Sequence, residues 1–193
     1  MKIVHLSSNE GNAGAAKAAI RIHKQCIINN IDSKFIVQNK ISNDNNVIDI
    51  KRYHNIFLTA KINSRLNALP LKFYKLKEKN NWSTSFLSYA KVDNIKEIKQ
   101  ADIVIIYWVC EGFLSISEIK KLLSLGKPII WRFSDMWPFT GGCHYSYSCN
   151  KYAHDCEKCP QLNSNSKYDL SNHIFNKKLK LWKNLENLTI IAP

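Results

Sequence analysis

The stretch Asp102-Ile-Val-Ile-Ile-Tyr-Trp108 carries an almost unbroken run of apolar side chains. A run of this kind, without polar alternation, is typical of a strand that is buried on both faces of a parallel sheet. The segment Pro128-Ile-Ile-Trp131 has the same character, and residues 116–125 between them have helical spacing that ends at Gly126. The pattern therefore predicts a strand, a helix and a second buried strand in succession.

The rest of the chain continues this alternation in both directions. A short strand (Ile3–Leu6), an alanine-rich helix (13–29) and a second strand (Lys34–Gln38) are expected before it, and a helix (170–187) and a last strand (Leu188–Pro193) after it. Strands that alternate with helices predict an α/β fold with a doubly wound, mostly parallel, Rossmann-like sheet. No repeat or linker interrupts the pattern, so we expect one domain over residues 1–193.

Ligands of such sheets bind beyond the carboxyl ends of the strands. That rule places three loops along one edge: the turn from Gly11 to Gly14, the residues from Trp108 to Glu111, and the residues from Ser134 to Gly142. Glycines at the first turn would let the following helix N-terminus approach a phosphate or carboxylate. The full dinucleotide fingerprint is missing, however, and an ordinary tight turn between strand and helix explains these glycines equally well.

Residues 135–160 form a stretch without helical or strand periodicity that is too rich in aromatic residues and cysteine to be disordered. We interpret it as an ordered functional insertion. Its four cysteines have the spacing Cys143-x5-Cys149-x6-Cys156-x2-Cys159, and a Cys-x-x-Cys pair with two further cysteines can form the Cys₄ shell of a structural zinc ion. His144 and His154 are reserve ligands. Free reduced thiols, or redox or disulfide use, are the alternatives.

The charge is strongly positive and unevenly distributed. The formal net charge is +13, and residues 51–79 hold eight basic residues against one acid, Glu78, with apolar residues interleaved. Over residues 53–68 the spacing is roughly helical with one basic edge, which suits a helix on an anionic membrane surface. A solvated basic face over a stripe that packs against the core is the other interpretation. No recognised nucleic-acid motif accompanies the charge, so nucleic acid is not an expected partner.

Length and hydropathy set the remaining limits. The chain has 193 residues, of which 45 % are hydrophobic, so it can bury a core without disulfides. It contains neither an apolar run of about 18 residues, as a membrane span requires, nor a secretory signal at its first residues. We therefore expect a cytoplasmic protein with reduced thiols.

Three motifs together carry a family resemblance. They are the glycine- and alanine-rich turn with Ala-Ala-x-Arg-x-His, the run Trp131-Arg-Phe-Ser-Asp-Met-Trp-Pro-Phe-Thr-Gly-Gly-Cys-His-Tyr145, and Cys156-x-x-Cys-Pro-Gln-Leu162. With these motifs the whole chain resembles the N-terminal half of bacterial family-four, retaining GT-B glycosyltransferases, which build colanic acid, O-antigen and capsule polysaccharides.

The resemblance implies one half of an enzyme with two Rossmann-like domains. In that family the N-terminal domain mainly holds the acceptor, which is lipid-linked or a saccharide, and the C-terminal domain holds the nucleotide-sugar donor. Pro193 falls about where the N-terminal domain would finish. We therefore expect the donor-binding domain to be absent or carried by a second polypeptide, and the chain alone to be inactive. The expected place of action is the inner face of the cytoplasmic membrane, in lipopolysaccharide or capsule assembly.

Candidate site residues follow from matching positions in the motifs. Ser134 stands where many related enzymes have a histidine, and Asp135 keeps the following carboxylate, so we expect both at the catalytic position. An N-cap or Asx-turn role explains Asp135 as well. Substrate contacts are expected from Gly11, Gly14, Arg21, Trp108, Trp137, Gly141 and Gly142. For Arg21 the alternative is a solvent-facing cation, and for the two tryptophans it is core packing.

A different class of function also fits the sequence. The chain can be a non-catalytic module in which a zinc-stabilised loop and a basic face dock onto a lipid surface or onto a partner glycosyltransferase. The two hypotheses differ in whether the expected cleft binds a substrate.

Overall fold

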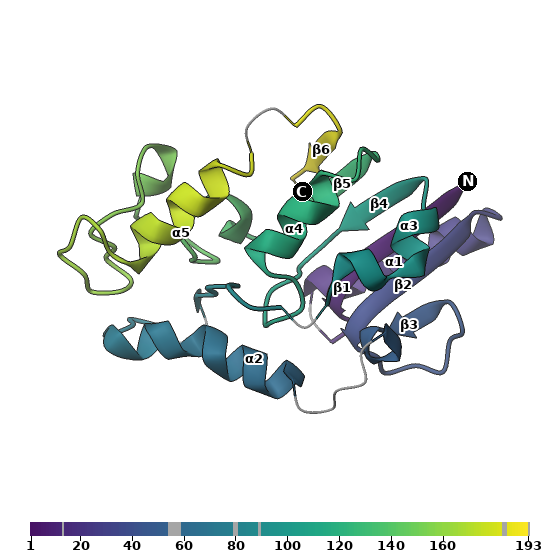
Figure 1. The fold of residues 1–193 in the computed structure, drawn as a ribbon, viewed down its shortest axis with the longest axis horizontal. Coiled ribbons are helices and arrows are strands. Elements are labelled where there is room, and N and C mark those ends of the chain that lie inside the picture. Colours follow the sequence, from purple (N-terminus) through teal and green to yellow (C-terminus); the bar gives the residue numbers. More distant parts are fainter. Residues whose placement is uncertain (13, 54–58, 79–80, 89, 183–184, 193) are drawn as a thin grey trace.

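The apolar run after Asp102 forms a central strand, β4, of one parallel sheet (Figure 1). The computed structural model describes residues 1–12, 14–53, 59–78, 81–88, 90–182 and 185–192. Within these residues six strands are ordered β3-β2-β1-β4-β5-β6, and every neighbouring pair is parallel. The strands are β1 (Lys2–Asn9), β2 (Asp32–Asn39), β3 (Val47–Asp49), β4 (Ile103–Ile106), β5 (Ile129–Arg132) and β6 (Leu188–Ile191). The predicted doubly wound, Rossmann-like fold is confirmed.

Helices connect the strands. The α-helices are α1 (Gly14–Ile28), α2 (Thr59–Ala68), α3 (Lys96–Gln100), α4 (Ile116–Leu123) and α5 (Leu170–Leu179). The 3₁₀ segments are η1 (Ile50–Tyr53), η2 (Leu69–Phe73), η4 (Val92–Asn94), η5 (Trp137–Phe139) and η6 (Lys151–Ala153). Among the described residues, no helix is both long enough and apolar enough to cross a bilayer.

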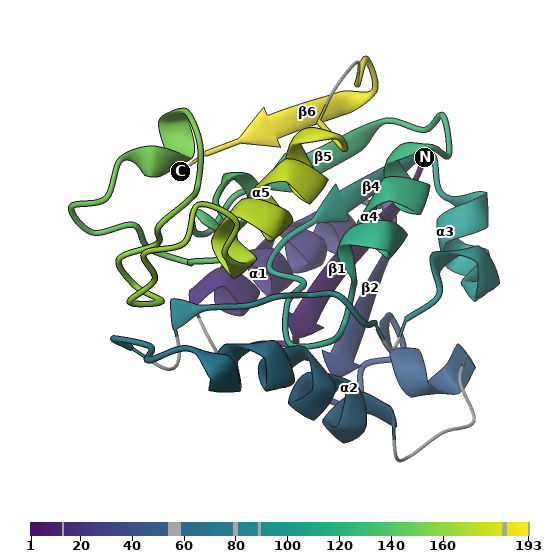
Figure 2. The ribbon, with the colours of Figure 1, turned by 60° about the vertical axis from the view of Figure 1, so that its left-hand side comes forward.

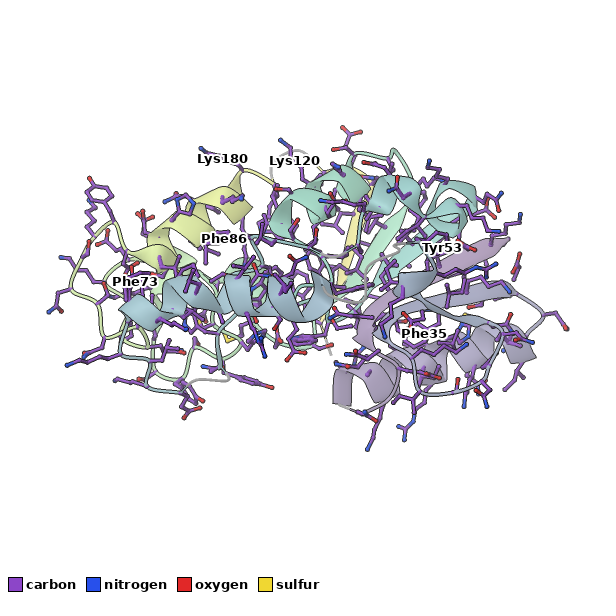
Figure 3. All side chains as sticks on the ribbon, turned by 60° about the horizontal axis from the view of Figure 1, so that its bottom comes forward. Phe35, Tyr53, Phe73, Phe86, Lys120 and Lys180 are labelled. Atoms are coloured by element: carbon purple, nitrogen blue, oxygen red, sulfur yellow. The ribbon has the colours of Figure 1, made fainter. Side chains whose placement is uncertain are left out.

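The two faces of the sheet bury different sets of side chains, because successive strand residues point to opposite sides. Ala19 of α1 packs with Phe35, Val37 and Tyr107 on one face (Figure 3). The larger core on the other face joins Leu6, Ile106 and other strand residues to α3, α4 and α5. Figure 2 shows these three helices on the near side of the sheet.

Buried polar side chains form a connected group between α1 and the sheet. His5 Nδ1 lies 3.0 Å from the Tyr107 hydroxyl, and His23 Nδ1 lies 2.7 Å from Ser33 Oγ. The two histidine rings meet edge to face with 5.4 Å between centroids, and both are fully buried. His23 is therefore a packed core residue.

The expected boundaries shift at several elements. β4 ends at Ile106 instead of reaching Trp108, and α5 ends at Leu179 instead of 187. The helix expected over 53–68 is described from Thr59 to Ala68, whereas residues 54–58 lie outside the described residues. The three-residue strand β3 was not predicted, since Val47-Ile-Asp49 is too short for a periodic signal.

The cysteine-rich loop, residues 135–160, lies beyond the carboxyl ends of the strands together with α5 and α2 (Figure 1). Residues far away in the sequence hold it. Trp82 and Cys143 form an antiparallel bridge, and Asn81 Nδ2 and Oδ1 each bond the backbone of Tyr145 at 3.0 Å. The insertion contains only the short 3₁₀ segments η5 and η6, and contacts to residues 81–83 help to order it.

Candidate functional site

A cleft of about 500 Å³ opens at the carboxyl edge of the sheet. In the strand order the chain winds outward from β1 to β3 and then returns on the other side at β4, so the topological switch point lies between β1 and β4. The cleft lies at this point and is lined by Ser7, Asn9, Gly14, Ala15, Ala16, Trp108, Glu111, Arg132, Ser134, Asp135 and Tyr145. All three loops that were expected at the edge contribute to it.

The end of β1 and the loop after β4 are tied together beside the cleft. The Ser8 backbone N–H donates to the Trp108 carbonyl at 2.8 Å, and Ser8 Oγ donates to the Cys110 carbonyl at 2.8 Å. Glu111, next in the loop, is exposed and has φ +58°, a left-handed conformation that is unusual for a residue with a side chain. Strained backbone of this kind concentrates at functional sites, and here it sets a carboxylate at the mouth of the cleft.

Asp135 and His144 form a pair at the base of the cleft. Asp135 Oδ2 lies 2.7 Å from His144 Nδ1, and Ser83 Oγ lies 2.8 Å from His144 Nε2. The Asp135 carboxylate accepts a hydrogen bond from the Nδ1–H group. In the neutral imidazole Nε2 then carries no proton, and it accepts a hydrogen bond from the Ser83 hydroxyl. The Trp108 indole N–H lies 3.4 Å from the same Nδ1, but a nitrogen that donates to Asp135 cannot also accept, so this approach is not a hydrogen bond. The other oxygen, Asp135 Oδ1, accepts the Trp137 backbone N–H at 2.9 Å, which is an Asx-turn.

Ser134 also lines the cleft, where the Arg132 guanidinium donates to its hydroxyl at 3.2 Å. Gly14 begins α1, and the first turn of that helix faces the cleft with backbone N–H groups that have no partner within the helix. No described atom lies within 4 Å of the position that a Cβ would take at Gly14 or Gly11. Close packing therefore does not explain either glycine.

Five residues that were predicted to contact a substrate are not among the described residues that line the cleft: Gly11, Arg21, Trp137, Gly141 and Gly142. Arg21 lies on the exposed side of α1, beside a separate shallow hollow. Trp137 is buried, its indole donates to the Ser83 carbonyl at 2.8 Å, and its ring packs against Lys178. Core packing, one of the two interpretations offered for the tryptophans, therefore describes Trp137, whereas Trp108 lies in the cleft.

Neighbouring atoms lie so close to residues 141 and 142 that only glycine fits at these positions. A Cβ at Gly142, where φ is +133°, would meet the Trp82 ring at 2.3 Å. A Cβ at Gly141 would meet the Ser171 carbonyl oxygen at 2.6 Å and the Cβ of Cys156 at 2.9 Å. Close packing around the loop therefore explains both glycines, and their contact with a substrate stays a prediction.

The four loop cysteines line a second, much smaller cavity, of about 20 Å³. All six cysteines of the chain lie in the described residues and are free thiols. Burial raises the pKa of Cys143 to about 11 and that of Cys156 to about 12. Next to them, burial lowers the pKa of the Lys178 ammonium to about 7, while Lys178 Nζ donates to the carbonyls of Trp137 at 2.5 Å and Thr140 at 3.2 Å.

Several cleft residues were not singled out from the sequence: Ser7, Asn9, Ala15, Ala16, Glu111, Arg132 and Tyr145. Ser7, Asn9 and Arg132 stand at strand ends, and the strand-end rule could have found them. Glu111 lay inside a range expected at the edge, but its backbone conformation has no sequence signal. Tyr145 lies at the cleft with its backbone bonded by the side chains of Asn81 and Gln161, which are distant in the sequence.

Comparisons of the chain with protein-family models, with curated proteins and with solved structures found no match. The chain is therefore an α/β protein with a six-stranded parallel sheet in its described residues and a cleft of mixed polar and apolar lining at the switch point.

Proposed function

We propose that this chain is the acceptor-binding half of a glycosyltransferase of surface-polysaccharide assembly. It positions a hydroxyl group of a saccharide or lipid-linked acceptor for transfer of a sugar from a nucleotide-sugar donor. The observation that carries the proposal is the cleft, where the rings of Trp108 and Tyr145 accompany the carboxylates of Glu111 and Asp135. Aromatic faces stack on the apolar face of a sugar ring, and carboxylates accept hydrogen bonds from its hydroxyls. The resemblance over residues 131–145 supports the same class.

The proposal gives each cleft residue a role. Glu111, at the mouth, accepts a hydrogen bond from an acceptor hydroxyl. Asp135 lines the cleft with its carboxylate orientation fixed by His144 and by the Trp137 N–H, so it can orient a second hydroxyl. Arg132 and Ser134 supply donors, the former with a permanent positive charge suited to a phosphate.

The described strands form one sheet, so the proposal assigns the nucleotide sugar to a second Rossmann-like domain, on this or another polypeptide. Catalysis would then consist of positioning the acceptor and of stabilising the leaving diphosphate electrostatically across the cleft between the domains. The 193 residues alone would bind acceptor and transfer no sugar.

Saturation-transfer difference NMR with a panel of methyl mono- and disaccharides tests the binding step. We expect saturation of at least one glycoside by the wild-type chain, and its loss in Tyr145→Ala and Glu111→Gln. Tyr168→Ala is the matched control, because Tyr168 is also an exposed tyrosine of this part of the molecule (84 % against 58 % for Tyr145) but does not line the cleft. A wild-type chain that binds no glycoside, or a Tyr145→Ala variant that binds as well as Tyr168→Ala, would overturn the proposal, as would sugar transfer by the chain alone.

One observation also favours a second function, docking on an anionic membrane. Exposed apolar residues lie along α2 and η2 at helical spacing: Ile62, Leu66, Leu69 and Phe73. Phe73 is 85 % exposed. Figure 3 labels it at the end of this segment. On its inner side α2 instead buries Asn67, whose amide bonds the Leu87 backbone at 2.8 and 2.9 Å. Among the described residues these four side chains are thus exposed, whereas Leu71 and Leu76 of the same basic stretch pack in or against the core.

Basic residues flank these four exposed side chains and fit a lipid surface better than a neutral protein partner. Arg65, Lys72, Lys75 and Lys77 are exposed beside it, and each cation near an anionic bilayer contributes about 1 kcal/mol. We expect flotation with phosphatidylcholine–phosphatidylglycerol vesicles, loss of flotation in Phe73→Ser and in the Lys72/Lys75/Lys77 charge reversal, and retention in Tyr168→Ser. Equal flotation of Phe73→Ser and Tyr168→Ser would remove the membrane role and leave the cleft proposal standing.

A further inference from the structure

Four cysteine side chains converge on one small cavity inside the cysteine-rich loop. Cys143, Cys149, Cys156 and Cys159 all line it, together with Trp82, Gly141 and neighbouring residues. Its volume of about 20 Å³ is room for one water-sized particle and excludes an organic ligand. Each sulfur lies close enough to the other three for their charges to interact. The loop therefore places four thiols along the wall of one small cavity.

Backbone N–H groups are directed at two of these sulfurs. The Gly141 N–H donates to Cys156 Sγ at 3.2 Å, and the backbone N–H groups of Gln161 and Leu162 lie near the Cys159 sulfur, where they favour its thiolate. Hydrogen bonds of this kind favour the thiolate over the thiol, and the thiolate is the form that binds a metal. Gly141 is needed for the first of them, because a Cβ there would collide with Cys156.

Two buried polar side chains, Asp169 and Lys178, lie next to the four cysteines. The Cys159 backbone N–H donates to the buried Asp169 carboxylate at 2.8 Å, which fixes the Cys-x-x-Cys turn. The buried Lys178 amine lies near Cys143 and Cys156, and its hydrogen bonds go to uncharged carbonyls. A divalent ion in four thiolates has a formal charge of −2, which would favour the protonated form of this amine.

We propose that Cys143, Cys149, Cys156 and Cys159 bind one structural zinc ion that locks the cysteine-rich loop. Four sulfur ligands without an open position select zinc in a closed, non-catalytic site. Among the described residues, no group of three or more histidine, cysteine or carboxylate side chains already has metal-binding geometry, so binding draws the four sulfurs inward into the cavity. His144, once a reserve ligand, is engaged by Asp135 and Ser83 instead. The proposal is independent of whether the cleft binds a sugar.

Metal analysis of the full chain, purified without chelator, is the first test. We expect one zinc per chain, and four fewer thiols reactive under native conditions than after chelation. Replacement by Co²⁺ gives a readout that needs no variant: a sulfur-to-cobalt charge-transfer band with the strong visible absorption of a tetrahedral site.

Cys149→Ser and Cys26→Ser form the matched pair of variants, because both cysteines are half-buried but only Cys149 belongs to the cavity. We expect Cys149→Ser to lose stoichiometric zinc and the cobalt bands, and Cys26→Ser to keep both. Zinc content near zero with no cobalt spectrum and four freely reactive loop thiols would overturn the proposal. So would a mass spectrum with disulfides among these four residues, or equal metal binding by the two variants.

Discussion

The sheet and the cysteine-rich loop differ in how their backbone N–H and carbonyl groups find hydrogen-bond partners and in what their side chains contact. In the sheet, backbone groups pair with neighbouring strands and the side chains are largely apolar and buried. In the loop, backbone groups pair with distant polar groups, such as the Asn81 amide at Tyr145 and the Lys178 amine at Trp137 and Thr140. The sheet therefore depends on apolar volume, and the loop on individual contacts.

The two regions therefore tolerate different amino-acid substitutions. A core of strands and helices accepts apolar substitutions of equal volume, because burial is not directional. A loop held by individual contacts does not accept even a methyl group where backbone and ring meet. The following predictions sharpen or break the comparison, in order of falling effect.

Leu6→Ala should have the largest effect, because Leu6 is fully buried in the central strand β1. We expect a loss of about 4 kcal/mol in the free energy of unfolding, from lost apolar burial and the cavity left behind. Urea unfolding followed by circular dichroism measures it. Leu6→Met is the control and should cost less than about 1.5 kcal/mol, since it conserves volume. Similar losses for the two variants would contradict the volume argument.

Gly142→Ala should come next, at about 3 kcal/mol, because the new methyl group overlaps the Trp82 ring and φ is +133°. Gly126→Ala isolates the backbone part, since φ there is +67° but no described atom lies within 4 Å of the added Cβ. We expect about 1 kcal/mol for it. Tryptophan fluorescence during unfolding reads out the local change. If both variants lost the same stability, ring contact would not be what makes the loop specific.

The buried histidine pair makes the sheet sensitive to acid. Burial, and then the charge of His23, lowers the pKa of His5 from 6.5 to about 3. Since the folded pKa lies below the unfolded value, the native state binds fewer protons, and stability present above pH 6.5 is lost as the pH falls. Between pH 7 and pH 5 His5 alone accounts for about 2 kcal/mol. Urea unfolding across this range measures the slope, which should be shallower in His5→Phe. An unchanged slope in that variant would assign the acid sensitivity elsewhere.

Asn81→Ala should have the smallest effect, about 1.5 kcal/mol, because it leaves the Tyr145 backbone N–H without its partner, whereas the Tyr145 carbonyl keeps the Gln161 side-chain amide. Asn29→Ala, which removes an exposed amide at the end of α1, should change stability by less than about 0.5 kcal/mol. Hydrogen exchange at Tyr145 gives the local readout. Full protection of that amide in Asn81→Ala would show that other contacts hold the loop.

Much of the sheet could be predicted from the sequence, because its signal is local. The apolar runs that became β4 and β5 fixed the class of fold, and the strand-end rule located the cleft. β3 escaped notice because three residues carry no period, and β4 and α5 end earlier than predicted, at Ile106 and Leu179.

The candidate site was predictable only in part for the same reason. Gly14, Trp108, Ser134 and Asp135 reach the cleft because they follow strands directly. The pairing of Asp135 with His144, and the burial of Trp137 under Lys178, depend on side chains that meet only in the folded chain. No periodicity or spacing records such contacts. The proximity of the four cysteines, in contrast, was implied by their spacing.

The central position of β1 has a consequence for synthesis. Its partner β4 lies far along the chain: the Lys2 backbone N–H donates to Asp102, 100 positions away. At about 5–20 residues per second the ribosome delivers β4 about 5–20 s after β1 has emerged. During that interval β1 can pair only with β2, and one long apolar edge stays open to other nascent chains. The step that closes this edge is the emergence of the run after Asp102, so the nascent protein is most exposed to aggregation before that run leaves the ribosome.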